Sequence, residues 1–169
     1  MKFSEQKKVV GVTGSFGSGK STVGSFFEEF GAFRADADEA ARGALWPSSA
    51  VFETVARLFP EARRREGGLC RKKLAEIIFS NARRRRDLEG VVHPYVFEKL
   101  KAAVAGAWQE IAILEIALLF ESGFDRACDH TVVVRAGHGQ IIERLKEKGF
   151  QQEEINKRLE AQMPLEEKT

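Results

Sequence analysis

The residues best suited to do chemistry form the stretch "GSFGSGKST", positions 14–22. It fits the pattern G-x-x-x-x-G-K-[ST], in which glycines let backbone N–H groups curl around phosphate oxygens without a Cβ in the way. The stretch follows a short apolar run and opens an amphipathic helix, whose positive end would face the phosphates. The spacing therefore predicts a site for the phosphates of a nucleoside triphosphate.

Individual roles at this site follow from the side chains. Lys20 is expected to reach the β- and γ-phosphates, and the hydroxyl of Ser21 is expected to bind Mg²⁺. No N-K-x-D motif follows any predicted strand, which counts against a GTPase. The predicted ATP-binding residues are Gly14, Gly17, Ser18, Gly19, Lys20, Ser21 and Thr22.

Composition limits the remaining classes of function. A chain of 169 residues with 43% hydrophobic residues can bury one ordinary core. A net charge of +2 is too small to indicate nucleic acid or an anionic membrane as the main partner, and no apolar run approaches the length of a membrane span. Cys70 and Cys128 have no metal-ligand spacing and fit a reducing compartment. We expect a cytoplasmic protein; its oligomeric state is not predicted.

Four apolar runs predict the strands that carry the loop, and they cover residues 9–13, 32–35, 111–120 and 131–136. Their apolarity is continuous rather than alternating, which is typical of parallel strands covered on both faces. Helical patterns lie between them, as parallel crossovers require. Residues 47–108 lack a strand pattern and predict a helical insertion, with a new helix expected to start near His93 and Pro94. A turn at Gly149 and a polar helix are expected near the end.

Further motifs follow the loop in a specific order. They are "DADEAAR" (36–42), "GLCRKKLAEIIF" (68–79), "VVHPYV" (91–96), "LLFESG" (118–123), "CDHTVVV" (128–134) and "RLEAQM" (158–163). The loop alone is generic, but this ordered set resembles the dephospho-coenzyme A kinase family over nearly the whole chain, from residue 9 to about residue 168.

This resemblance implies an activity and a fold. The family transfers the γ-phosphoryl group of ATP to the ribose 3′-hydroxyl of dephospho-coenzyme A, with Mg²⁺, as the last step of coenzyme A biosynthesis. The fold implied is an α/β, P-loop NTPase-type three-layer fold with a five-stranded parallel sheet. We expect the core at about 8–46 and 109–140, a helical substrate-binding insertion at about 47–108 and a small lid at about 141–165.

The family continues beyond "PLEEKT" into a last strand and helix that help surround adenine. The chain as given is therefore expected to be either naturally short or incomplete.

The resemblance also assigns the acidic pair that follows the second strand. Asp38 is expected to be the catalytic base that accepts the proton of the acceptor hydroxyl, and Asp36 a capping or Mg²⁺-shell residue that helps to bind substrate. A helix cap is the alternative for both. Arg42 is expected to hold the substrate near the base, or to form a plain ion pair.

Other substrate and metal contacts are implied farther along the chain. His93, Phe120 and Glu121 are expected to contact the substrate, although His93 could simply belong to a helix start. Glu115 is expected in the middle of a buried strand, where an unpaired carboxylate is costly, and to reach Mg²⁺ through water. Phe120 and Glu121 are expected to end that strand.

Two arginines are placed in the lid. Arg144 and Arg158 are expected to meet the transferring phosphoryl group, and Arg144 is expected to be catalytic. Exposed helix positions are the alternative for both. The arginine runs at 63–65 and 83–86 are expected to be solvated surfaces, or else to attract the pyrophosphate of the substrate. The rival functions are another small-molecule P-loop kinase and a nucleotide-binding protein without catalysis.

Overall fold

The protein is described here by a computed structural model that covers residues 2–168. Two compact units are present: one combines the residues up to Ala37 with those from Leu100 onward, and the other spans Asp38–Lys99. The assignment of functional domains made from the sequence stays a prediction.

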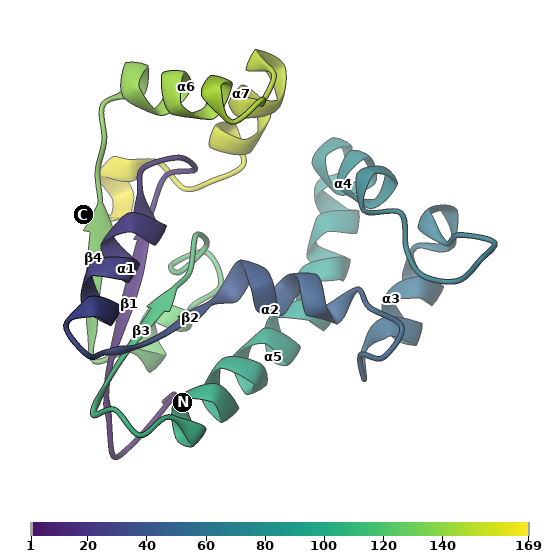
Figure 1. Ribbon diagram of the computed structural model, residues 1–169. Coiled ribbons are helices and arrows are strands. Elements are labelled where there is room, and N and C mark those ends of the chain that lie inside the picture. The colour runs from purple at the N-terminus through teal and green to yellow at the C-terminus, as the bar shows by residue number, and fades with distance from the viewer. Residues whose placement is uncertain (1, 169) are drawn as a thin grey trace. The chain divides into compact units, whose positions relative to one another are not determined.

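A four-stranded parallel sheet forms the centre of the first unit (Figure 1). Its order is β2-β3-β1-β4, with bounds β1 (Lys8–Gly14), β2 (Phe33–Asp36), β3 (Ile111–Glu115) and β4 (His130–Val134). Asp36 is in register with Glu115, and Gly14 with Val134, so the carboxyl ends of all the strands meet at one edge. Ligands of open parallel sheets bind beyond this edge. The α/β prediction is confirmed; the described residues contain four strands where the resemblance implied five.

The third strand is shorter than the sequence predicted. β3 ends at Glu115. The N–H of the next residue, Ile116, still donates to the carbonyl of Val12, and the chain turns beyond it. Phe120 and Glu121 therefore do not end a strand, and Glu115 is a last residue rather than a middle one. The apolar run continues because the turn itself is buried: a Cβ on Gly11 would lie 2.9 Å from the side chain of Leu119.

One face of the sheet is covered by α1 (Lys20–Glu29), which starts directly after the glycine-rich loop (Figure 1). Buried Val12, Ala32 and Ile113 form the core of this layer. Val23 and Phe27 of α1 pack against them. The predicted order of strand, loop and helix is confirmed.

Beyond the carboxyl ends of β1 and β4 lie α6 (His138–Glu147) and α7 (Gln152–Glu160) (Figure 1). Gly149 has a φ of 86° in the turn between them, as expected. Ile141, Leu145 and Ile155 form a small core of their own. The short helices η2 (Phe124–Ala127) and η3 (Leu165–Lys168) complete this unit.

The second unit is helical. Its elements are α2 (Ala37–Ala44), α3 (Phe52–Leu58), η1 (Pro60–Ala62), α4 (Arg71–Ser80) and α5 (Ala82–Gly106), of which α2 and α5 continue into the first unit. Within the unit, Arg84 is bonded to both carboxylate oxygens of Glu61 at 3.0 Å, with its guanidinium 4.5 Å from the ring centroid of Phe59. One member of the second arginine run is thus a packing residue.

The prediction of a helix start near His93 and Pro94 is wrong. Pro94 lies inside α5, which begins at Ala82 behind Asn81. The side chain of Asn81 accepts the N–H groups of Arg83 and Arg84 at 3.0 and 3.1 Å, which satisfies donors that a helix start leaves unpaired. Among residues 2–168, none of the helices has the length and apolar character needed to cross a bilayer.

Candidate nucleotide-binding site

The glycines of the loop are required by its backbone. Gly14, Gly17 and Gly19 have φ angles of 145°, 80° and 101°, a region that favours glycine. A Cβ on Gly14 would overlap the carbonyl oxygen of Val134, and one on Gly17 would lie 2.9 Å from Leu145. The backbone φ angles therefore favour glycine at all three positions, and β4 and α6 also leave no room for a side chain at Gly14 and Gly17.

Lys20 lies within the curl of this loop. Its Nζ donates to the carbonyl oxygens of Gly14 and Ser15, both at 3.0 Å. The hydroxyl of Ser18 is buried with no hydrogen-bond partner among the described residues. A cation at the bottom of the loop is the arrangement that phosphate binding needs.

Arg144 of α6 reaches the same loop. Its Nη1 lies 3.8 Å from the position that a Cβ on Gly19 would occupy. Arg144 belongs to an exposed part of the helix, whereas its neighbour Leu145 is buried against the loop. Lys20 and Arg144, the two cations predicted to act on the phosphates, thus both lie at this loop, Lys20 at Gly14 and Ser15 and Arg144 at Gly19.

Arg158 also lies next to the loop, but against its one aromatic side chain. The guanidinium carbon is 4.8 Å from the ring centroid of Phe16 and 5.1 Å from that of Phe150. Glu154, one helical turn earlier, accepts a bond from Nη2 at 2.7 Å. Arg158 is therefore a partly exposed helix residue whose guanidinium packs on two rings, and its predicted contact with the transferring phosphoryl group stays a prediction.

Glu115 is buried beneath α1 and has a cationic partner. Its carboxylate accepts a bond from Nε of Arg34 on β2, and this bond raises the pKa of Arg34 above its ordinary value. Gly24 of α1 faces the pair, because a Cβ there would overlap the carboxylate. The ion pair accounts for an acid at a buried position. The predicted contact of Glu115 with Mg²⁺ through water stays a prediction.

The oxygen donors near the loop are suited to Mg²⁺. Ser21 is the second residue of α1 and is exposed, and Asp36 ends β2 at the carboxyl edge of the sheet. Mg²⁺ takes one or two protein oxygens and completes its shell with phosphates and water. Within residues 2–168, no group of three or more His, Cys, Asp or Glu residues could hold a metal by itself. The chemistry of this donor set fits a metal that arrives with a nucleotide.

Glu121 is tied to the C-terminal segment of the described chain. Its Oε1 accepts the N–H of Met163 at 2.8 Å and pairs with Nζ of Lys168 at 2.9 Å. The same lysine donates to the carbonyl of Ala117 at 3.1 Å, an oxygen that also accepts the hydroxyl of Thr13. Glu121 therefore has a structural role, and the predicted substrate contacts of Glu121 and Phe120 stay predictions.

Three predicted site residues belong to the helical unit. Asp38 and Arg42 lie on α2, both exposed. His93 lies half-buried inside α5, where burial lowers its pKa below the ordinary value while nearby Glu89 opposes this effect. Their roles toward a substrate stay predictions.

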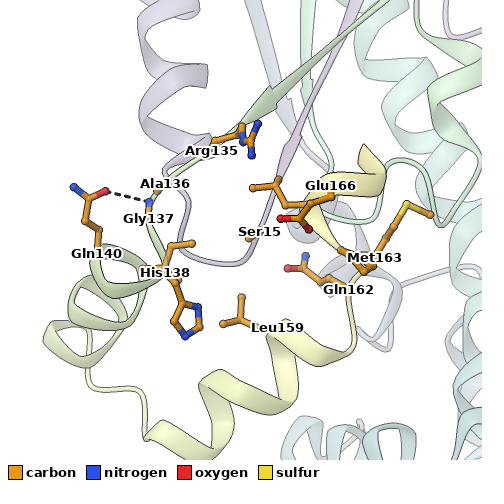
Figure 2. A pocket seen from close by; sticks show the side chains of 13 residues that line it. Ser15, Arg135, Ala136, Gly137, His138, Gln140, Leu159, Gln162, Met163 and Glu166 are labelled. Carbon is orange, nitrogen blue, oxygen red and sulfur yellow. Dashed lines mark hydrogen bonds between the residues drawn. The ribbon is translucent and has the colours of Figure 1, made fainter. Parts of the chain in front are cut away.

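A hollow of about 710 Å³ borders the loop at Ser15 (Figure 2). The turn after β4 and the start of α6 form one wall, with Arg135 and His138 (Figure 2). The segment after α7 forms another wall, with Gln162 and Glu166. A nucleotide bound by the loop could extend into a space of this size, which is in the usual range for ligand pockets.

The sequence reasoning missed three residues at this site: Arg34, Phe16 and Gln162. Arg34 had a signal, because a buried glutamate needs a cation and Arg34 is the only basic residue within β2. Phe16 is the only apolar side chain between Gly14 and Thr22. Gln162 carried no signal beyond its place in "RLEAQM", since its partner is a backbone N–H far away in the sequence.

Comparisons with known proteins identify relatives of this chain. A family model described as dephospho-CoA kinase matches residues 8–169. The dephospho-CoA kinase of Geobacillus kaustophilus is 38% identical over 164 residues, which cover 94% of this chain and 82% of that protein. The dephospho-CoA kinase of Aquifex aeolicus is 34% identical, and the match covers 95% of this chain and 83% of that protein.

Solved structures show the same likeness. The crystal structure of TT1252 from Thermus thermophilus matches with a TM-score of 0.86 at 36% identity, covering 97% of this chain and 84% of that one. Dephospho-CoA kinase from Campylobacter jejuni matches with a TM-score of 0.61 at 26% identity, and the match covers 99% of this chain and 84% of that one. Because the family model matches almost from end to end and its members share this fold, the chain belongs to the dephospho-CoA kinase family.

Proposed function

We propose that this chain transfers the γ-phosphoryl group of ATP to the ribose 3′-hydroxyl of dephospho-coenzyme A, giving coenzyme A and ADP. The observation that carries the proposal is the loop itself: in a chain of this family, Lys20 lies within the curl and Arg144 faces Gly19. Phosphoryl transfer needs mainly positioning and charge stabilisation, which these two cations supply.

In the proposed reaction the acceptor 3′-oxygen attacks the γ-phosphorus while the bond to the bridging oxygen of ADP breaks. Asp38 accepts the proton of the hydroxyl, and Arg42, His93, Phe120 and Glu121 hold the acceptor. Ser21 and Asp36 would hold Mg²⁺, with Glu115 reaching it through water, and the ion would neutralise charge on the phosphates. The ribose and base of ATP occupy the hollow beside Ser15.

We place the reaction in the cytoplasm. The support is that Cys70 and Cys128 are both free thiols, as is usual in a reducing compartment.

The experiment is a turnover assay of the purified chain with Mg²⁺, ATP and dephospho-coenzyme A, following both ADP and coenzyme A. Lys20→Ala should lower turnover by roughly 10²-fold or more, because its charge is lost where the transferring phosphate gains charge. Lys101→Ala, an exposed lysine of α5, is the matched control and should keep full activity.

Each rival function gives a different result in this assay. Turnover with nucleoside monophosphates but not with dephospho-coenzyme A would indicate a kinase with another acceptor. ATP binding without turnover of any acceptor would indicate a nucleotide-binding protein. Near-normal turnover of Lys20→Ala would contradict the site.

A further inference from the structure

Phe16 connects the phosphate-binding loop to the α6–α7 pair. Its half-buried ring packs against the small core formed by Ile141, Leu145 and Ile155. It also meets the ring of Phe150 edge to face, with centroids 5.2 Å apart and an interplanar angle of 86°. A side chain from the loop is thus part of the core of another element.

Arg158 holds this aromatic pair from α7. Its guanidinium carbon lies within about 5 Å of both ring centroids, and Glu154 fixes its Nη2. Nε is buried and has no hydrogen-bond partner among the described residues. The guanidinium is therefore used in stacking and in one ion pair within its own helix.

Gln162 binds the backbone of Phe16. Its Oε1 accepts the N–H of Phe16 at 2.8 Å, and its Nε2 lies 3.5 Å from the carbonyl oxygen of Ala117. Gln162 follows Arg158 by one helical turn of sequence. The ring and the N–H of Phe16 are consequently both held by the same stretch of chain.

We propose that Arg158 and Gln162 are positioning residues, which fix the phosphate-binding loop through Phe16 and do not contact the transferred phosphoryl group. The inference rests on the proposed function only in that the loop binds a nucleotide. It separates Arg158 from Arg144, whose Nη1 faces Gly19 directly. A loop that is already held in its binding conformation loses less conformational freedom when phosphates bind. Holding the loop should therefore raise the affinity for ADP, which keeps the phosphates that the loop binds.

The first test is calorimetric affinity for ADP, which lacks the transferred group. Arg158→Ala should lower the affinities for ADP and for ATP by the same factor, about 3- to 10-fold for the loss of one stacked cation. KM for ATP should rise by that factor while kcat changes little. Lys157→Ala removes one charge from the same helix and should change neither value. Unchanged ADP affinity with a lowered kcat would overturn the proposal, because Arg158 would then act on the transferred group.

The second test is a double-mutant cycle. Phe16→Leu keeps an apolar side chain but removes the ring face, so it should weaken ADP binding about as much as Arg158→Ala. The double variant should bind ADP no more weakly than either single variant. If the loss of ADP affinity in the double variant equals the product of the two single losses, Arg158 acts independently of Phe16 and the proposal is wrong. Arg158→Lys keeps the charge without the flat guanidinium and should not restore affinity.

Gln162→Met tests the backbone contact, because the side chain keeps its length and loses its acceptor. ADP affinity should fall about 3-fold or more for one lost hydrogen bond, whereas Gln151→Met, at an exposed position before α7, should leave it unchanged. A lower melting temperature with parental ADP affinity in the Arg158 and Gln162 variants would mean that they serve stability alone, which contradicts the proposal.

These measurements need no acceptor. A parent chain that binds ADP but does not phosphorylate dephospho-coenzyme A would contradict the proposed function and leave these comparisons intact. A parent chain that binds no ADP would contradict both.

Discussion

Arg34 on β2 and Glu115 at the end of β3 form an ion pair beneath α1. The side chain of Glu115 is 4% exposed and that of Arg34 is 24% exposed. Arg34 also donates to Ser25 and Glu28 of α1, at 3.1 and 3.4 Å. The pair thus joins two strands to the helix that follows the phosphate-binding loop.

Arg34→Met should lower the free energy of unfolding by about 3 kcal/mol, because it leaves a buried carboxylate without its partner. The double variant Arg34→Met with Glu115→Leu should recover much of this loss, since neither charge is then buried. Urea unfolding of the three proteins measures both effects. A single variant as stable as the parent would show that the pair contributes nothing.

Asp38→Asn should lower turnover by roughly 10²-fold or more, because the amide keeps the shape of the side chain and cannot accept the acceptor proton. ATP affinity should stay within a few-fold. Steady-state kinetics with both substrates measures this, with Asp36→Asn as the comparison. If Asp36→Asn is the more damaging variant, the base is Asp36.

Arg144→Ala should lower kcat by about 10²-fold, the usual cost of removing one group that stabilises transition-state charge. ADP affinity should hardly change, in contrast to the pattern expected for Arg158. Single-turnover kinetics and ADP calorimetry on one preparation separate the two roles. Equal losses in ADP affinity and in rate would show that Arg144 binds the nucleotide in its ground state instead.

The phosphate-binding loop could be predicted because its requirements are local. Gly17 and Gly19 need positive φ angles, and Lys20 follows at a fixed spacing, so one short stretch contains the whole signal. The sheet was also predictable, since buried parallel strands are continuous apolar runs. The glycine spacing and the apolar runs can each be recognised within a short stretch of sequence.

The features that sequence reasoning missed depend on distant contacts. The end of β3 was misplaced because the turn after it is as apolar as the strand, and Leu119 packs beneath Gly11. Pro94 is a helix breaker by local rules, yet α5 passes through it. Gln162 bonds to a residue 146 positions away, a pairing that no local pattern contains.

The last prediction concerns acid stability and rests on Asp129, just before β4. Its Oδ2 accepts the N–H of Val9 at 2.8 Å, and Lys8 lies 3.8 Å from its Oδ1. The Val9 N–H is the main reason that the pKa of Asp129 lies below its ordinary value, with Lys8 adding a smaller effect. Because folding depresses this pKa, the ionised group stabilises the fold above the unfolded pKa, about 3.9, and that stabilisation is lost as the pH falls through the folded value.

Asp129→Asn keeps an oxygen for the Val9 N–H and removes the charge. At pH 7 the variant should be less stable than the parent by about 1 kcal/mol, the difference between a charged and a neutral hydrogen bond. Urea unfolding at several pH values should show this difference constant above about pH 5 and shrinking below about pH 4, as Asp129 of the parent becomes protonated. Glu66→Gln, at an exposed loop position, is the control and should show no such change. A difference that persists unchanged to pH 3 would mean that the carboxylate charge does not stabilise the start of β1.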